Sequence, residues 1–293
     1  MRTMRERQRT AALGDPGRNV RRAIVVYLRT GDWDPTFAAW PGNIIARCTT
    51  GGAALRAELI RAVLRRAAGR PAPVSVPGTG LRALVRKRLA PMVQGLFPAA
   101  ERSVVLELLV RGIVFCTPDN IRKVLLSEAH WPKTAWDVAN LYLGSLGAPL
   151  LSRSAPRILG LSEGVACYVS MEYFAASHRF DDFLLHEAAH VFHNCKRSTA
   201  GLPATRRREW LLDIAYAKRE TFAWSCEAYG CIVRLDRRVS ARRELAEEWG
   251  RTIRPGDDRV DASEVADILQ EAVSAKNGWK RILARCAPAR MKA

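Results

Sequence analysis

The chain has 293 residues, a formal net charge of +18 and 48% hydrophobic residues. This apolar fraction argues against a disordered chain and favours one or two globular domains. The seven cysteines show no paired spacing typical of a disulfide framework, and no stretch approaches the roughly 18 continuous apolar residues needed to span a bilayer.

The N-terminal part of the chain is strongly basic. Residues 1–22 carry seven arginines against two acidic residues, which predicts a flexible basic arm. A helical basic region is expected over 23–97, with helices at Ala53–Ala68 and Leu81–Leu89 separated by a linker rich in proline and glycine. Such a region would bind nucleic acid or another polyanion weakly. The first residues lack the apolar core of a signal peptide, so we expect a cytoplasmic protein.

The central part of the chain, residues 98–236, is expected to form the main domain. It opens with a helix after Pro98, and its two predicted strands are Val138–Leu143 and Gly164–Phe174, the second of which alternates in side-chain type. Residues 237–293 are expected to form a helical C-terminal region. The predicted fold class is therefore α+β, mainly helical, with a small sheet before the helix described next.

The segment His186-Glu187-Ala188-Ala189-His190 is the most informative motif of the sequence. Residues four apart lie on one face of a helix, so the two imidazoles can bind one metal ion. Asp181 and Asp182 can cap the start of this helix, and its apolar flanks predict burial. Glu187 stands where a zinc peptidase keeps the carboxylate that deprotonates a metal-bound water.

A catalytic zinc takes three protein ligands and keeps one position for water, so a third ligand is required. His193 shares the helix face, but seven residues span about 10.5 Å from the first histidine, which favours a role in the second shell or the pocket wall. No histidine follows it, and a carboxylate is the simplest remaining ligand. Asp213, Glu220 and Glu227 are spaced by seven residues on a long helix predicted from Arg207 to about Leu235.

We choose Glu220 as the third ligand, partly on a family resemblance. The motif, followed by an acidic residue on a downstream helix, resembles the gluzincin metallopeptidases. Glu220-Thr221-Phe222-Ala223 resembles the Glu-x-Phe-Ala element of the anthrax lethal factor type of domain, and the ImmA/IrrE-type regulatory peptidases have a comparable helix. The resemblance covers about residues 160–235. It implies a zincin-like core with Zn²⁺ held by His186, His190 and Glu220.

The resemblance also suggests roles for residues around the metal. The strand Gly164–Phe174 would be the sheet edge that holds an extended peptide substrate, although a plain core strand explains its sequence equally well. Tyr216 or Tyr229 would donate a hydrogen bond to the oxyanion of the tetrahedral intermediate, although packing explains either tyrosine as well. Helix geometry adds that Glu227 lies about 10.5 Å beyond Glu220, so it would serve the second shell or the substrate if Glu220 is the ligand; Glu227 itself is the alternative third ligand.

Two functions follow from these observations. The first is a zinc-dependent metallopeptidase that hydrolyses peptide bonds of an intracellular protein, with Glu187 as the base. The alternative is a basic nucleic-acid-binding protein whose metal site is structural or vestigial. The sequence contains no helix-turn-helix signature, zinc-finger spacing or RNA-binding aromatic motif in support of this alternative.

Overall fold

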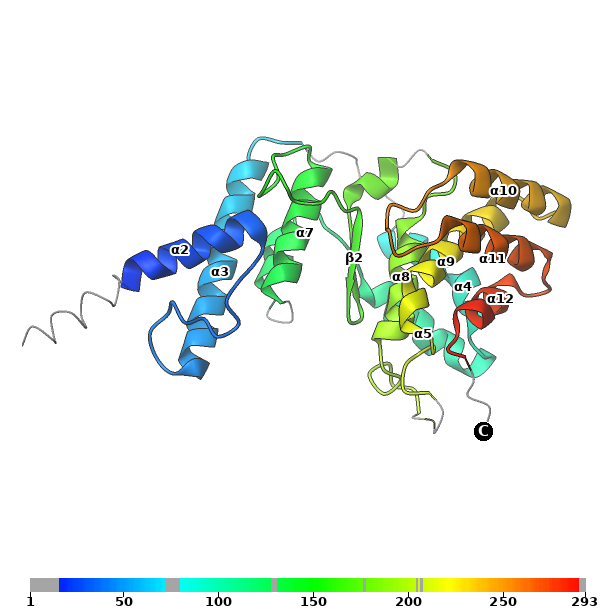
Figure 1. Cartoon of the computed structure of the whole chain (residues 1–293), viewed down its shortest axis with the longest axis horizontal. Helices are drawn as coiled ribbons and strands as arrows, with labels where there is room; N and C mark the ends of the chain where they lie inside the picture. The colour runs from blue at the N-terminus through cyan, green and yellow to red at the C-terminus, as the bar shows by residue number, and fades with distance from the viewer. Residues whose placement is uncertain are drawn as a thin grey trace, which may run out of the picture. The chain divides into compact units, whose positions relative to one another are not determined.

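The computed structural model describes residues 16–71, 80–127, 131–175, 178–203, 205 and 208–289. Across these residues the chain is mainly helical with one three-stranded sheet, which confirms the expected α+β class. The chain divides into two compact units, drawn in Figure 1: Met1–Pro73 with Cys116–Ile158, and Val74–Phe115 with Leu159–Ala293. The segments expected from the sequence, with boundaries after residues 97 and 236, do not coincide with these units.

The first unit consists of helices packed around α3 (Ile44–Ala67), which contacts α2 (Pro16–Thr30), α6 (Ile121–Leu126) and α7 (Pro132–Ser145). Two long-range hydrogen bonds tie α2 to α7: Tyr27 Oη donates to the Pro132 carbonyl at 2.7 Å, and Trp136 Nε1 donates to the Leu28 carbonyl at 3.1 Å. Most of the arm expected at 1–22 lies outside the described residues. Its last part, from Pro16, belongs to α2 and is therefore helical rather than an arm.

The expected strand Val138–Leu143 is wrong, because these residues lie in the middle of α7. All six are buried, so the helix is covered around its whole circumference in this stretch, and the amide of Asn140 is paired inside with the Trp136 carbonyl and the Leu151 N–H. A short apolar run of this kind suits a buried strand and a buried helix equally well, and its sequence alone does not distinguish them. Pro132 at the first turn of α7 favours the helix, since its fixed φ and missing N–H are tolerated there.

The second unit contains the sheet, whose strand order is β1-β3-β2. The strands are β1 (Ile113–Phe115), β2 (Gly160–Glu163) and β3 (Ala166–Val169); β1 is parallel to β3, and β2 is antiparallel to it. The expected strand Gly164–Phe174 is thus too long. Gly164 has φ +59° between β2 and β3, and Met171–Ala175 forms the 3-10 helix η1. Because β3 lies between the other two strands, the expectation that this segment forms a sheet edge is also wrong, and the two edges are β1 and β2.

The remaining elements of this unit are helical, and most of them contribute side chains to one apolar core that the sheet shares. They are α4 (Leu81–Leu96), α5 (Ala99–Gly112), α8 (Phe183–Asn194), η2 (Tyr216–Lys218), α9 (Arg219–Leu235), α10 (Val239–Thr252), α11 (Ala262–Ser274) and α12 (Gly278–Cys286). The helix expected from Arg207 begins only at Arg219. Among the described residues, no helix is long and apolar enough to cross a membrane.

Candidate metal centre

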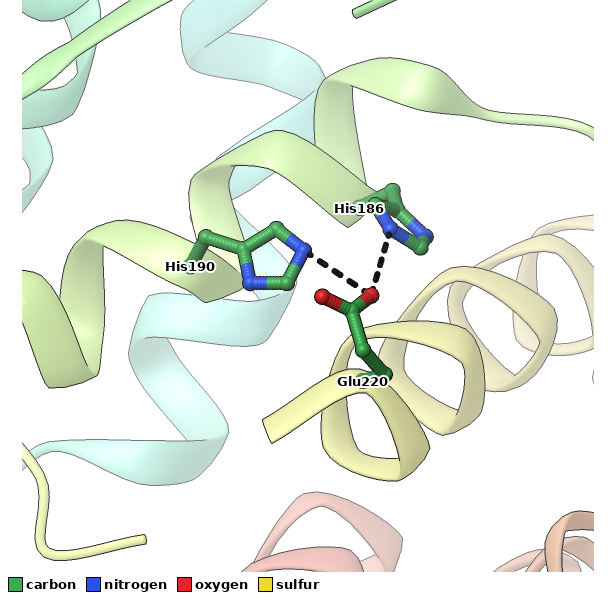
Figure 2. Close-up of side chains that lie close together, drawn as sticks. All are labelled: His186, His190 and Glu220. Carbon is green, nitrogen blue, oxygen red and sulfur yellow. Dashed lines mark ion pairs between the residues drawn. The ribbon is translucent and has the colours of Figure 1, made fainter. Parts of the chain in front are cut away.

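The motif helix α8 is placed by its packing against α9. Ala188, Ala189, Val191 and Phe192 are fully buried on α8, and Phe222 and Ala223 are fully buried on α9. This packing leaves the face that carries His186 and His190 directed at the first turn of α9, where Glu220 lies (Figure 2).

The three side chains converge on one point. Glu220 Oε2 lies 3.8 Å from His186 Nε2 and 3.5 Å from His190 Nε2, and the three donor atoms lie within 4.8 Å of one another (Figure 2). The side chains of His186, His190 and Glu220 are only 15%, 12% and 22% exposed. Donors about 2.1 Å from a tetrahedral zinc lie roughly 3.4 Å apart, so small adjustments would bring these atoms around an ion. The group could therefore hold a metal ion.

His186 is oriented by a carboxylate on the next turns of α9. Its Nδ1 lies 3.0 Å from Glu227 Oε2, while Glu227 Oε1 accepts a hydrogen bond from the Asp182 backbone N–H at 2.7 Å. Burial disfavours the charge of His186, but hydrogen bonds to Glu220 and Glu227 outweigh it and raise the pKa of His186 to about 10. With this pKa both ring nitrogens carry protons when no metal ion is bound. A metal ion would displace the Nε2 proton, and the Nδ1–H facing Glu227 would keep the Nε2 lone pair directed at the centre.

His190 is oriented by a second pair of contacts. Its Nδ1 lies 3.0 Å from His193 Nε2, and His193 Nδ1 lies 3.0 Å from Asn194 Oδ1. His193 is 4% exposed, and burial, together with the positive charge of His190 and Arg219, lowers its pKa to about 3. A neutral His193 can donate from Nδ1 to Asn194 Oδ1 and accept at Nε2 from the Nδ1–H of His190. It therefore orients His190 and lies outside the three-donor group.

Glu187 lies beside the three donors and against the sheet edge. It is 8% exposed, and a Cβ added at Gly160 would lie 2.5 Å from Glu187 Oε1, so the first residue of β2 must be small. Burial raises the pKa of Glu187, while the nearby histidines and a hydrogen bond with Ser162 oppose that increase. The carboxylate is thus held next to the donors by contacts with β2.

Three expected residues lie away from this centre or have another partner. Asp213 precedes α9, so the expectation that it shares a helix face with the two glutamates is wrong. Tyr216 is 83% exposed and its ring lies 4.9 Å from the guanidinium of Arg219. Tyr229 is buried, with its ring 4.9 Å from that of Trp279, which makes it a packing residue.

The sequence does not reveal several neighbours of the centre. Gly160 and Ser162 come from β2, and Arg259 Nη2 lies 3.2 Å from Glu220 Oε1. These contacts join elements distant in the chain, so no spacing indicates them. The Trp224 ring lies 5.3 Å from that of His186; its position four residues after Glu220 was a usable signal, since such residues share a helix face.

Asp182 has a different role from the one expected of it. It occupies the N-cap position of α8, but its side chain makes no capping hydrogen bond. Its carboxylate accepts hydrogen bonds from Arg234 and from the Tyr173 hydroxyl instead.

No family model, curated protein or solved structure matches this chain.

Proposed function

We propose that the chain is a zinc-dependent metallopeptidase. The observation that carries the proposal is the convergence of His186, His190 and Glu220 beside Glu187. Two imidazoles and one carboxylate form a donor set used by hydrolytic zinc sites, in which the fourth position stays open. A Zn²⁺ ion held there would lower the pKa of water and polarise a peptide carbonyl.

The residues around the centre support hydrolysis in distinct ways. Glu187 accepts the proton of the attacking water and returns it to the leaving amine. Its contacts with β2 keep the carboxylate in one place. Glu227 and His193 hold the two imidazoles with Nε2 directed at the donor group, because each contacts the corresponding Nδ1.

The position of β2 favours a peptide as the substrate. Among the described strands, β2 pairs only with β3, so its other edge is not covered by a strand. An extended peptide adds to such an edge through main-chain hydrogen bonds. Since Glu187 lies against β2, a peptide bound along this edge would pass beside the base. The substrate we infer is an intracellular protein that presents an extended segment.

The test compares wild type with Glu187→Gln and with a control, Glu247→Gln, at an exposed position of α10. Each protein is purified without added metal, its zinc content is measured by elemental analysis, and cleavage of a peptide library is followed by mass spectrometry. We expect about one zinc per chain in all three. Cleavage should fall by about 10²–10⁴-fold in Glu187→Gln alone, because a general base is lost. Wild-type cleavage by this variant, or activity in a folded protein without zinc, would refute the proposal.

A further inference from the structure

The second unit contains a cavity of about 840 Å³ that the proposed function does not use. It lies between α4, α8, α9 and α12, helices labelled in Figure 1. Its lining combines four cationic side chains with apolar ones. The cations are Lys87, Arg88, Arg234 and Arg237.

Two of these cations are held in place by one buried acid. Arg88 Nη1 and Arg234 Nη1 lie 3.4 Å and 2.5 Å from the same oxygen, Asp182 Oδ2, and the Asp182 side chain is only 1% exposed. Arg234 also donates to Cys231 Sγ at 3.4 Å. Fixed guanidinium groups lose little freedom when they bind a phosphate, and their planar donors match its oxygens.

The positive charge of the cavity exceeds what Asp182 can balance. Within the described part of the chain, neither Lys87 nor Arg237 forms an ion pair with an acidic side chain. Even with the neighbouring carboxylate of Glu227 counted beside Asp182, the four cations leave an excess of positive charge around the cavity. Like charges gathered around a partly enclosed space focus the field and attract an anion into it.

The rest of the lining is apolar and includes Leu185, Val233 and Trp279. Trp279 is set into the wall by two glycines: a Cβ at Gly95 would lie 2.1 Å from its Cδ1, and one at Gly230 would lie 3.2 Å from its Cη2. We propose that this cavity binds a small organic phosphate, with the phosphate on the arginines and an apolar or aromatic group against Leu185, Val233 and Trp279. Its volume is in the usual range for small-molecule sites.

The cavity is also connected to the metal centre. Asp182 precedes α8, and its backbone N–H donates to Glu227, whose other oxygen contacts His186. A phosphate would compete with Asp182 for Arg88 and Arg234 and would loosen this support of His186. We infer that phosphate binding weakens zinc binding, an inference that rests on the proposed metal site. By linkage, zinc then weakens phosphate binding by the same factor.

Titration calorimetry on the full chain tests the binding. The probes are octyl phosphate, adenosine diphosphate and inorganic pyrophosphate, which separate an aliphatic group, an aromatic group and the anion alone. The variant is Lys87→Ala with Arg237→Ala, since neither residue contacts Asp182. The control is Lys276→Ala with Arg251→Ala, which removes the same two charges from exposed positions.

We expect one organic phosphate to bind at least about tenfold more tightly than pyrophosphate. The cavity variant should weaken that binding about tenfold, while the control changes it less than about twofold, because charge-assisted contacts act at short range. Absence of binding by all three probes, or an equal loss in both double variants, would overturn the site. Pyrophosphate binding as tight as that of the better-binding organic phosphate would overturn the apolar part.

The coupling has a separate readout. Competition with a chromophoric chelator gives the zinc Kd with and without the tighter organic phosphate, and we expect the phosphate to raise it at least about threefold, as outer contacts of ligands affect metal affinity. An unchanged zinc Kd would overturn the coupling while the cavity result stands. A chain that binds the phosphate but no zinc would overturn the proposed function, and the coupling with it.

Discussion

Glu227→Gln tests how the centre is supported. In the structure, Glu227 uses one oxygen for the Asp182 N–H at 2.7 Å and the other for His186 Nδ1 at 3.0 Å. Glutamine has only one acceptor oxygen. If that oxygen takes the Asp182 N–H, the amide NH₂ faces Nδ1 and shifts the imidazole proton to Nε2, the atom needed for the metal. If the oxygen faces His186 instead, the glutamine NH₂ and the Asp182 backbone N–H, both of them donors, face each other.

Either arrangement should weaken zinc binding without removing a ligand. Loss of such an orienting contact typically costs 10–100-fold in metal affinity, or about 1.4–2.7 kcal/mol. The assay is chelator competition on wild type, Glu227→Gln and the exposed control Glu247→Gln, with Glu220→Ala for comparison. We expect the loss in Glu227→Gln to be clearly smaller than that in Glu220→Ala. A wild-type zinc Kd in Glu227→Gln, or a loss equal to that of Glu220→Ala, would refute the reasoning.

Three further predictions concern other parts of the chain. Gly160→Ala places a Cβ 2.5 Å from Glu187 Oε1, so peptidase activity should fall by about 10²-fold with zinc content unchanged, because a small displacement of a reacting group is costly. Retained activity would contradict this placement of the base. Glu101→Ala leaves the buried Arg197 without its carboxylate partner and should lower the free energy of unfolding by about 3 kcal/mol in a denaturant titration. The Arg197 hydrogen bond lowers the pKa of Glu101, so this stabilisation is present above the usual pKa of a carboxyl and is lost as the pH falls through the lowered value. The free energy of unfolding of Glu101→Ala should therefore fall less in acid than that of wild type, and identical pH profiles of the two proteins would count against the Glu101–Arg197 ion pair. Deleting residues 1–15 removes four arginines and should reduce retention on heparin and make it less salt-dependent; unchanged elution would exclude a polyanion role for this segment.

The sequence by itself determined the features that depend on one helix. The spacing of His186 and His190 places both imidazoles on one face, and their apolar flanks predict burial. The shared helix face and the expected burial are both local features, because residues close together on one helix are enough to determine them. The choice of Glu220 also came from the sequence, by eliminating further histidines and by resemblance, and the structure brings its carboxylate within 3.8 Å of both imidazoles.

Only the tertiary structure decided the surroundings of these residues. The sequence of Val138–Leu143 suits a buried strand and a buried helix equally well, and packing within the first unit selects the helix. The sheet edge beside the Glu187 carboxylate is β2, because the pairing order places β3 in the middle of the sheet. Asp182 was expected to cap α8, yet arginines from α4 and α9 reach its carboxylate. Each outcome depends on contacts between residues far apart in the chain, which a local pattern of side chains does not encode.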